Sequence, residues 1–397
     1  MITILSGGAI VLADRVVEPG TIALESGRIV EVRLGSARAG EGVIDVSGQV
    51  IVPGFIDVHV HGVEGQDTLA TANAVAEIAR RLPRYGVTGF CPTTVACGPV
   101  ELRHLLEGIS AARATPVPGS AHVLPAHLES NFIAPDFRGA QPLACLRRPT
   151  ADVLPGPTPE AAHFSGADIL AVIAAARRQV GILTIAPEID GHLDLIRDLV
   201  GHGHIVSLGH SGATFEQGLA GVEAGGRHAT HLFNRMPPLS HRAPGLIGAV
   251  LSRLEVRAEI VCDGYHVHPV VARTAMAALG RDRTMAITDG TAGAGLPVGS
   301  VVPLGSHTIT VTNDACFLPD GTLAGSRLTM DGAFRNLIAR MGASLVDAAY
   351  MCATTPARQL GLTRTGEIAV GMAADLAVLT KDFRVVTTYV DGAISGG

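Results

Sequence analysis

Apolar and polar residues alternate with two different periods along the chain. Residues 2–52 follow a period of two between glycine turns, as in 21–24 and 28–32. This period predicts short antiparallel strands, because successive side chains point to opposite faces of a strand. The tail from about residue 364 returns to the same pattern and ends in an Asp-Gly turn. Both ends of the chain are therefore expected to build one small β-domain.

Between these ends, eight short apolar runs recur, and most of them are followed by a helical pattern. The runs occupy 52–60, 86–93, 121–129, 181–187, 204–210, 227–233, 255–263 and 283–289. Stretches rich in Ala, Leu, Arg and Glu at helical spacing separate them, among them 72–84, 100–113, 166–180, 214–224, 269–280 and 330–341. Strands that alternate with helices predict a parallel sheet, and eight of them predict a closed (β/α)8 TIM-like barrel.

These patterns predict an α/β protein with two domains. The barrel is expected over residues 52–356, and the small β-domain is discontinuous, over 1–51 and 357–397. Residues 306–311 alternate again before a turn at 319–321, which predicts a hairpin insertion near 298–325. A chain of 397 residues is long enough for this organisation, since such a barrel takes roughly 250 residues.

Charge and composition exclude several classes of function. The formal net charge is −6, without a dense cluster of Lys and Arg, which argues against nucleic-acid binding. Apolar runs stay shorter than the roughly 18 residues that span a membrane. The first twenty residues lack the basic start of a signal peptide, and the six cysteines form no Cys-x-x-Cys pair. We therefore expect a cytoplasmic protein with buried thiols and a small polar substrate.

Titratable or polar residues stand at the carboxyl ends of most predicted strands. They are His59, His61, Thr93, Thr94, Glu129, Glu188, His210, His231, Asp263 and Asp289. In a (β/α)8 barrel the active site lies at that rim. The sequence therefore predicts that these side chains converge on one site.

Four histidines and one glutamate in this set predict a metal site. His59 and His61 share one face of a strand, because alternate residues do. A single histidine is more often structural. His59 and His61, together with Glu129, His210 and His231, form a ligand set. Imidazole and carboxylate groups suit Zn, Fe, Co, Mn or Ni, and sequence does not choose among them.

Asp289 closes the eighth predicted strand. A carboxylate there can take a proton from metal-activated water and return it to a leaving amine. The alternative role is to cap the next segment. Given the neighbouring ligand set, we predict that Asp289 is catalytic.

The motifs resemble those of N-acetylglucosamine-6-phosphate deacetylases in the amidohydrolase superfamily, over nearly the whole chain. They are PGFIDVHVHG, HLE followed by RGAQP, GHSGAT, ATHLFNRMP with RAPGLIG, DGYH, ITDGTAGAG, GTLAGSRLTM, TTPARQLGL and GEIAVGMAADLAVL. The resemblance implies a barrel with a β-sandwich domain formed by both termini. It also implies a metal-dependent carbohydrate amidohydrolase that converts N-acetylglucosamine 6-phosphate to glucosamine 6-phosphate and acetate, in amino-sugar catabolism.

The resemblance assigns roles to the candidate ligands. Glu129, His210 and His231 would bind the principal metal, His59 and His61 a second one, with Asp289 as general acid and base. Members hold one ion or two, and zinc is the first expectation here. Many amidohydrolases bridge two metals with a carboxylated lysine, but the only lysine of this chain lies in the tail, at residue 381. Glu129 must therefore supply the carboxylate ligand, as it does in the deacetylase family.

Substrate contacts also carry over by resemblance. The positions are Ala140, Gln141, Asn234, Arg235, Arg242, the segment from Asp263 to His266, and Leu323, Ala324 and Gly325. A planar guanidinium matches phosphate oxygens, so Arg242 is the expected phosphate partner. Family dimers place this arginine near the neighbouring subunit's site, which implies a homodimer.

Several positions depart from the family pattern and leave the substrate open. Ser130-Asn131 replaces a common Gly-Pro, Gln141 replaces a histidine, Arg235 replaces a small residue, and Gly290 replaces an alanine. N-acetylgalactosamine or N-acetylmannosamine 6-phosphate is therefore an alternative substrate. Two other hypotheses are hydrolysis of another small N-acyl amide, and a catalytically silent sugar-phosphate-binding protein. An Arg242 that does not affect turnover would favour the other amide.

Overall fold

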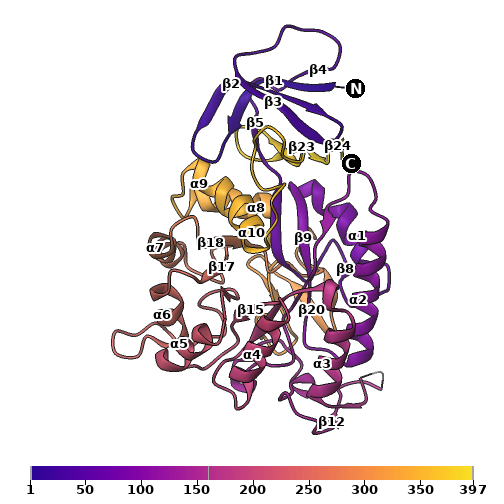
Figure 1. Cartoon of the computed structure of the whole chain (residues 1–397), viewed down its shortest axis with the longest axis vertical. Coiled ribbons are helices and arrows are strands. Elements are labelled where there is room, and N and C mark those ends of the chain that lie inside the picture. Colours follow the sequence, from indigo (N-terminus) through magenta and orange to yellow (C-terminus); the bar gives the residue numbers. More distant parts are fainter. Residues whose placement is uncertain (1, 160, 396–397) are drawn as a thin grey trace.

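The centre of the molecule is a barrel of eight parallel strands. The computed structural model describes residues 2–159 and 161–395. The barrel strands lie side by side in chain order (Figure 1). They are β6 (Phe55–Val60), β9 (Val87–Thr94), β11 (Ala126–Leu128), β14 (Val180–Ile185), β15 (Ile205–Leu208), β16 (His228–Ala229), β17 (Arg257–Val261) and β18 (Thr284–Ile287). The ring closes where Val60, at the end of β6, bridges to Gly290 after β18.

Helices cover the outside of this barrel (Figure 1). They are α1 (Ala74–Arg81), α2 (Pro99–Ala114), α3 (Gly166–Ala175), α4 (His192–Gly201), α5 (Phe215–Glu223), α6 (Gly245–Ser252), α7 (Pro269–Leu279), α8 (Met330–Ala339), α9 (Leu345–Ala349) and α10 (Thr355–Gln359), with a π-helical turn over Tyr350–Thr354. Their apolar faces pack on the strands, and the main core cluster joins strand residues such as Phe55 with helix residues such as Phe334. Within the described residues, no helix is both long enough and apolar enough to cross a membrane.

Both ends of the chain pair in a second sheet of eight strands. It contains β1 (Ile2–Val11), β2 (Val16–Glu25), β3 (Arg28–Leu34), β4 (Val43–Asp45), β5 (Val50–Pro53), β22 (Leu376–Leu379), β23 (Val385–Val390) and β24 (Ala393–Ile394). The two ends meet where β22 pairs antiparallel with β5, with Leu376 opposite Pro53. A core cluster of its own, which includes Leu5, Ile22 and Val378, holds this sheet together.

The step from this sheet into the barrel requires a glycine. Only Gly54 separates β5 from β6. A Cβ atom at Gly54 would lie 2.2 Å from the Cγ2 atom of Thr88 in β9. The chain can therefore enter the barrel directly from the small sheet only because residue 54 has no side chain.

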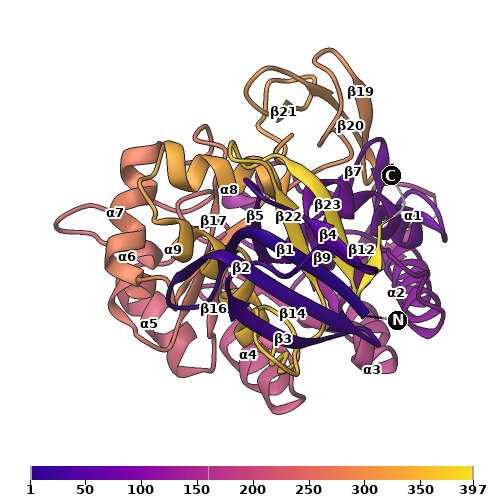
Figure 2. The same cartoon turned by 90° about the horizontal axis from the view of Figure 1, so that it is seen from above.

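Short antiparallel strands lie beside the barrel. The largest group is β19 (Val301–Leu304), β20 (His307–Val311) and β21 (Cys316–Phe317), which stands at the side of the barrel in Figure 2. Its apolar residues pack on Val95 and Ala292. Two further antiparallel pairs are β7 (Gly62–Val63) with β8 (Gln66–Asp67) and β12 (Leu154–Pro155) with β13 (His163–Phe164). The short strand β10 (His122–Val123) pairs in parallel with β9.

The predicted fold class, a (β/α)8 barrel with a small β-domain from both termini, is confirmed. Six of the eight predicted runs contain their barrel strand, and β9 and β14 each extend one residue beyond theirs, to Thr94 and from Val180. Helix α6 had no clear pattern in the sequence, because its residues are apolar on almost every side and five of them are buried.

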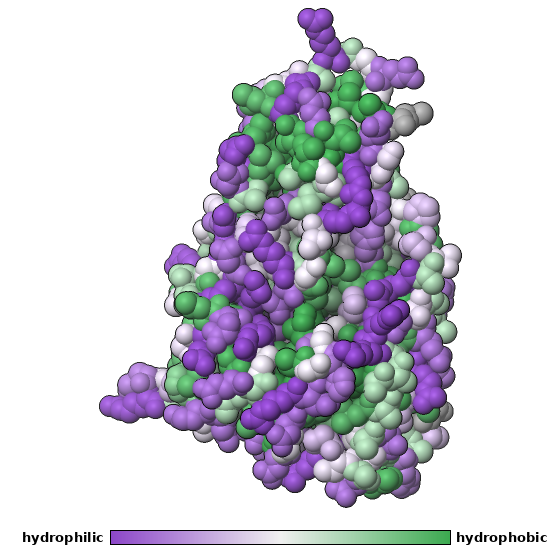
Figure 3. All heavy atoms as spheres, in the orientation of Figure 1, coloured by the Kyte–Doolittle hydropathy of each residue, from purple (hydrophilic) through white to green (hydrophobic). Residues whose placement is uncertain are grey.

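Apolar side chains also gather on the surface of the small domain. In Figure 3 they form green areas in its upper part. The exposed large apolar residues of β1 to β4 are Ile2, Val16, Val30, Leu34 and Ile44.

Candidate active site

Three side chains from separate strand ends meet at one point. Glu129 follows β11, His210 lies just after β15, and His231 just after β16. The Nε2 atoms of His210 and His231 each lie 2.8 Å from Oε1 of Glu129, and they lie 3.0 Å from each other. The Nδ1–H of His210 donates to the carbonyl oxygen of Phe137, at 2.7 Å. The Nε2 of His210 is therefore left with a lone pair that faces the other two side chains.

His59 and His61 complete the cluster from the first strand. Their Nε2 atoms lie 3.2 Å apart. The Nε2 of His59 lies 3.7 Å from Oε1 of Glu129, and that of His61 lies 3.4 Å from Oε2 of the same carboxylate. The structure thus brings together all five predicted ligands, in two groups that share Glu129.

This donor set fits divalent cations. A tetrahedral ion with bonds of about 2.0–2.2 Å holds its ligand atoms about 3.4 Å apart. The distances between the cluster atoms, from 2.8 to 3.7 Å, bracket that value. Imidazole lone pairs that face each other in a buried site also need a positive charge between them. The residues present therefore fit one ion among Glu129, His210 and His231, and another among His59, His61 and Glu129.

The carboxylates around His59 and His61 favour positive charge on these imidazoles and raise their pKa values. Burial opposes a charge on His59, but Glu259, Asp289 and Glu129 outweigh burial and raise its pKa to about 9. His61 behaves in the same way, because Asp289 and Glu129 raise its pKa to about 10 against the effect of burial. Protons would thus occupy these imidazoles when no cation does.

Asp289 lies beside both imidazoles of the first strand. Its Oδ1 atom is 3.4 Å from Nε2 of His59 and 3.4 Å from Nε2 of His61. Burial opposes its ionisation, but His59, His61 and His231 outweigh burial and lower the pKa of Asp289. The side chain is therefore a carboxylate at neutral pH and can accept a proton.

Left-handed backbone aims these side chains. The φ angles are 47° at His210, 25° at His231 and 49° at Asp289. A non-glycine residue in this region costs on the order of 1–3 kcal/mol and persists only where the surroundings hold it. Strain is thus concentrated at the strand ends that carry the cluster.

A small cavity lies over the cluster, with a free volume of about 50 Å³. Most predicted substrate contacts line it: Ala140, Gln141, Asn234, Arg235, His266, Leu323, Ala324 and Gly325. Val95, Thr291 and Leu304 also line it and were not predicted. Val95 lies just beyond the predicted run 86–93, and Leu304 lies in the predicted hairpin insertion near 298–325; these patterns predict strands and not a cavity wall.

Two predicted contacts lie elsewhere. Arg242 is exposed and bonds to the neighbouring His241, at 2.8 Å, so it does not line the cavity of its own chain. Asp263 lies behind His266, whose Nδ1 atom is 2.6 Å from Oδ2 of Asp263. The aspartate therefore holds this histidine in place, and the histidine faces the cavity.

The departures from the family pattern have defined partners. Gln141 donates from Nε2 to Glu129 and accepts from the backbone N–H of Ala96, so it orients the shared carboxylate. Ser130 donates to the carbonyl oxygen of Thr184 at 2.5 Å. Asn131 donates to the carbonyl oxygens of residues 97 and 145, at 2.8 and 2.7 Å. Ser130 and Asn131 are buried and bond to backbone below the cavity.

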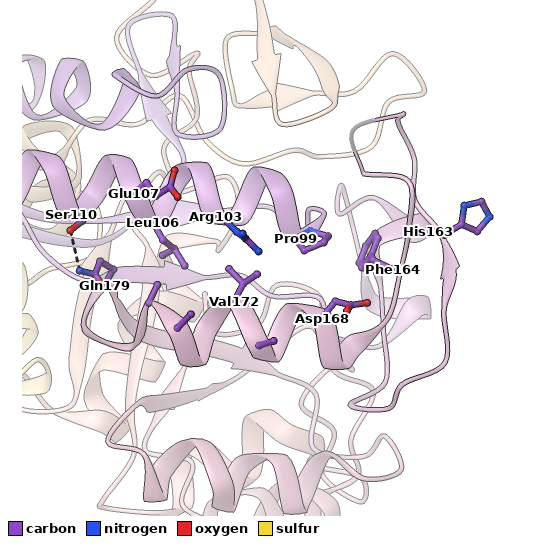
Figure 4. Close-up of a pocket in the computed structure, with 13 residues that line it drawn as sticks. Pro99, Arg103, Leu106, Glu107, Ser110, His163, Phe164, Asp168, Val172 and Gln179 are labelled. Atoms are coloured by element: carbon purple, nitrogen blue, oxygen red, sulfur yellow. Dashed lines mark hydrogen bonds between the residues drawn. The ribbon is translucent and has the colours of Figure 1, made fainter.

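A larger groove of about 720 Å³ lies between α2 and α3 (Figure 4). Leu106 and Val172 line it from the two helices, and Gln179 donates to Ser110 at one end, at 3.3 Å. Among the described residues, the clusters of metal-ligating side chains lie outside this groove. The chemistry therefore places the candidate active site in the smaller cavity.

The sequence matches the amidohydrolase family over residues 50–394, and the chain belongs to that family. N-acetylglucosamine-6-phosphate deacetylase of Bacillus subtilis (strain 168) is 32% identical over 394 residues, which cover 98% of this chain and 95% of that protein. N-acetylgalactosamine-6-phosphate deacetylase of Escherichia coli O157:H7 is 30% identical over 355 residues, or 89% of each chain.

A solved structure agrees with these relatives. It is a mutant of N-acetyl-D-glucosamine-6-phosphate deacetylase from Mycobacterium smegmatis in complex with N-acetyl-D-glucosamine-6-phosphate. It matches this chain with a TM-score of 0.88 at 30% identity, and the match covers 100% of both chains. The resemblance that the motifs predicted is therefore confirmed.

Proposed function

We propose that this enzyme removes the acetyl group from N-acetylglucosamine 6-phosphate, giving glucosamine 6-phosphate and acetate in amino-sugar catabolism. The observation that carries the proposal is the convergence of Glu129, His210 and His231 with Asp289 beneath one cavity. Relatives of nearly the same length that carry this activity support the choice of substrate.

Hydrolysis of the amide needs an activated water and a proton for the leaving nitrogen. A cation bound by the cluster would polarise the acetyl carbonyl and lower the pKa of water. Asp289 accepts a proton from the attacking water on its carboxylate and delivers it to the nitrogen as the C–N bond breaks. Acetate and the free amine are then the products, and Asp289 returns to its ionised form. Gln141 keeps Glu129 in place during these steps.

Arg235 and His266 supply positive charge to the cavity wall. Arg235 is half-buried, and its Nη2 donates to the carbonyl oxygen of Leu323 at 3.3 Å. Burial opposes a charge on His266, but Asp263 outweighs burial and raises its pKa. We propose that these two side chains bind the 6-phosphate, with Asn234 and the 323–325 segment contacting the sugar.

The cavity must widen to hold the substrate. Its free volume of about 50 Å³ is small beside the roughly 300–1,000 Å³ of ordinary ligand sites. Arg235 and Leu323 form part of its wall, so we propose that they move apart when the sugar enters.

We further propose zinc as the metal, a homodimer and a cytoplasmic location. The cluster offers nitrogen and carboxylate oxygen ligands, which suit zinc. In a dimer, the exposed Arg242 would reach the neighbouring subunit's cavity and add a second guanidinium for the phosphate. The six cysteines are all buried free thiols, as expected in a reducing compartment.

Acetate release from a panel of N-acetylhexosamines, each with and without a 6-phosphate, tests the proposal. The highest kcat/KM is expected for N-acetylglucosamine 6-phosphate. A chelator should abolish turnover, and elemental analysis of the untreated enzyme identifies the metal. Size-exclusion chromatography with light scattering tests the dimer.

The E. coli relative that acts on the galactosamine compound supports N-acetylgalactosamine 6-phosphate as a second candidate. Preference for that sugar or for the mannosamine analogue would correct the substrate but keep the reaction. Equal turnover of sugars without phosphate would favour a general amide hydrolase. If the protein binds the phosphorylated sugars but releases acetate from no compound of the panel, a silent sugar-phosphate-binding protein would be favoured.

A further inference from the structure

Glu259 is a carboxylate inside the barrel that the proposed reaction does not use. It lies in the middle of β17, and its side chain is fully buried. Among the described residues, its ion pairs are with the imidazoles of His59, His127 and His228. A carboxylate removed from water is costly unless its partners compensate. Its contacts therefore indicate its role in the barrel.

Both oxygens of Glu259 have partners below the metal cluster. Oε2 lies 2.9 Å from Nδ1 of His59, and Oε1 lies 2.8 Å from Nε2 of His228. The backbone N–H of His231 also donates to Oε2, at 3.0 Å. One carboxylate thus contacts a residue from each of the two groups that share Glu129.

The contact with His59 fixes the form of that imidazole. An ionised carboxylate only accepts hydrogen bonds, so the proton of His59 lies on Nδ1. Nε2, which lies 3.7 Å from Glu129 and 3.4 Å from Asp289, is then the nitrogen whose lone pair a cation can take in place of the second proton. A histidine whose other nitrogen donates to a carboxylate is held in one tautomer and is a stronger metal ligand.

The contact with His231 supports strained backbone. The φ angle of His231 is 25°, and the hydrogen bond to Oε2 holds its N–H at that position. The imidazole is consequently kept 2.8 Å from Glu129.

His59, His127 and Glu259 could in principle hold an ion of their own, since their donor atoms lie within 4.8 Å of one another. However, Nδ1 of His127 donates to the carbonyl oxygen of Val58 at 3.0 Å, and its Nε2 bonds to Thr184 at 2.9 Å. Nδ1 of His59 is likewise used by Glu259. These nitrogens are engaged in hydrogen bonds, so this group is a supporting network.

We propose that Glu259 is the positioning residue that prepares His59 to bind a second cation beside Glu129, and so sets the number of ions in the centre. The inference rests on the metal centre of the proposed function. It assigns Glu259 no contact with substrate.

Metal titration of the chelated protein with zinc tests the proposal, with Glu259→Met and Glu259→Gln beside the wild type. Methionine keeps the volume but accepts no comparable hydrogen bond, so binding of the second zinc ion should weaken at least about 10- to 100-fold. Glutamine retains an acceptor oxygen without the charge, so its loss should be smaller. In both variants the first ion should still bind to Glu129, His210 and His231, with a smaller loss of affinity than at the second site, because Glu259 contacts only the backbone of His231.

Ser207→Ala is the matched control, because Ser207 is buried in β15, which β16 separates from β17, and bonds to Thr230 rather than to the cluster. It should bind zinc as the wild type does. A wild type that binds no zinc would overturn the metal centre itself. Wild-type stoichiometry and affinity in Glu259→Met would overturn only the role of Glu259.

A second measurement does not depend on the folding of the Glu259 variants. The nitrogen and proton NMR signals of the imidazoles in the zinc-loaded wild type report which nitrogen of His59 carries the proton and which one binds zinc, and His59→Asn assigns the signal of interest. The expected result is a proton on Nδ1 of His59 and zinc on Nε2. A His59 with its proton on Nε2 would overturn the proposal.

Discussion

At the scale of single residues, Asp289 combines burial, a lowered pKa and a position beside two imidazoles. Asp289→Asn keeps the size of the side chain but removes its basicity. We expect kcat to fall by about 10²–10⁴-fold, the range for loss of a general acid and base, while metal content is unchanged. Acetate release and elemental analysis on the same sample measure both effects. A variant with wild-type kcat would remove Asp289 from the mechanism.

Arg235 and Arg242 are two candidate ligands for the 6-phosphate. A hydrogen bond to a charged group contributes roughly 1.5–3 kcal/mol, which corresponds to about 10- to 100-fold in affinity. Arg235→Ala should therefore raise KM for the phosphorylated sugar by that factor, with a smaller change in kcat. The KM and kcat of both variants, with Arg148→Ala as an exposed control, are the measurement.

The outcome separates the two arginines. An unchanged KM in Arg235→Ala would contradict its role as phosphate ligand. Arg242→Ala could raise KM for the phosphorylated sugar in the dimer but leave it unchanged in a monomeric form of the enzyme. That result would indicate that the partner subunit supplies the second guanidinium.

The candidate ligands could be predicted from sequence because each one lies at the end of an apolar run, or directly after it, at the barrel rim. The partners of Gln141 and Glu259 could not. Gln141 joins Glu129, 12 positions away, to Ala96, 45 positions away, and Glu259 bonds to His59, 200 positions away. Sequence spacing gives the face on which a residue lies, but not which distant side chain it contacts. The sequence nevertheless contains one signal for Glu259, because it is the one acidic residue within the apolar run 258–262.

At the scale of elements, α3 begins with a reciprocal cap. Ser165 Oγ accepts from the backbone N–H of Asp168 at 3.2 Å, and Oδ2 of Asp168 accepts from the N–H of Ser165 at 2.7 Å. Ser165→Ala removes one of these bonds and should lower the free energy of unfolding by about 1 kcal/mol. Urea unfolding measures the change.

The same substitution should leave kcat and KM unchanged, because α3 is on the outside of the barrel and Ser165 does not line the active-site cavity. Ser110→Ala in α2 provides an exposed serine as control. A loss of activity in Ser165→Ala without loss of stability would show that the helix start is coupled to the site.

Element boundaries were predictable where period and caps agreed. The predicted stretch 100–113 lies within α2, Pro99–Ala114, because an apolar face and a proline at the helix start coincide there. Around His231 the prediction was longer than the strand, since β16 ends at Ala229 and the chain then adopts positive φ angles. That turn is held by tertiary contacts, including the bond to Glu259, which leave no local signal.

At the scale of the whole molecule, the chain ends in the sheet where it began. The alternating pattern at both ends predicted a shared β-domain, but the pairing of β5 with β22 joins residues more than three hundred positions apart. Local sequence does not encode such a register. It follows from burying one apolar face of all these strands in a single core.

The contact between the barrel and this sheet makes a prediction about pH. The Nε2 atom of His122, in β10, lies 3.5 Å from Oδ1 of Asp375 and 3.6 Å from Oδ2 of Asp391, both next to strands of the terminal sheet. Asp375 raises the pKa of His122 and Asp391 adds to this effect, although burial opposes them. The protonated histidine therefore stabilises the contact.

Because the folded-state pKa lies above the unfolded value of about 6.5, this stabilisation is complete below that pH and is lost as the pH rises through the folded-state pKa. The side chain of His122 is 35% exposed, so the contribution should stay below about 1 kcal/mol. Urea unfolding of the chelated protein at increasing pH should show a smaller decline in His122→Gln than in the wild type. His104 is an exposed histidine on α2, and His104→Gln should show the same decline as the wild type. Parallel curves for all three proteins would show that the ion pair does not stabilise the contact between barrel and sheet.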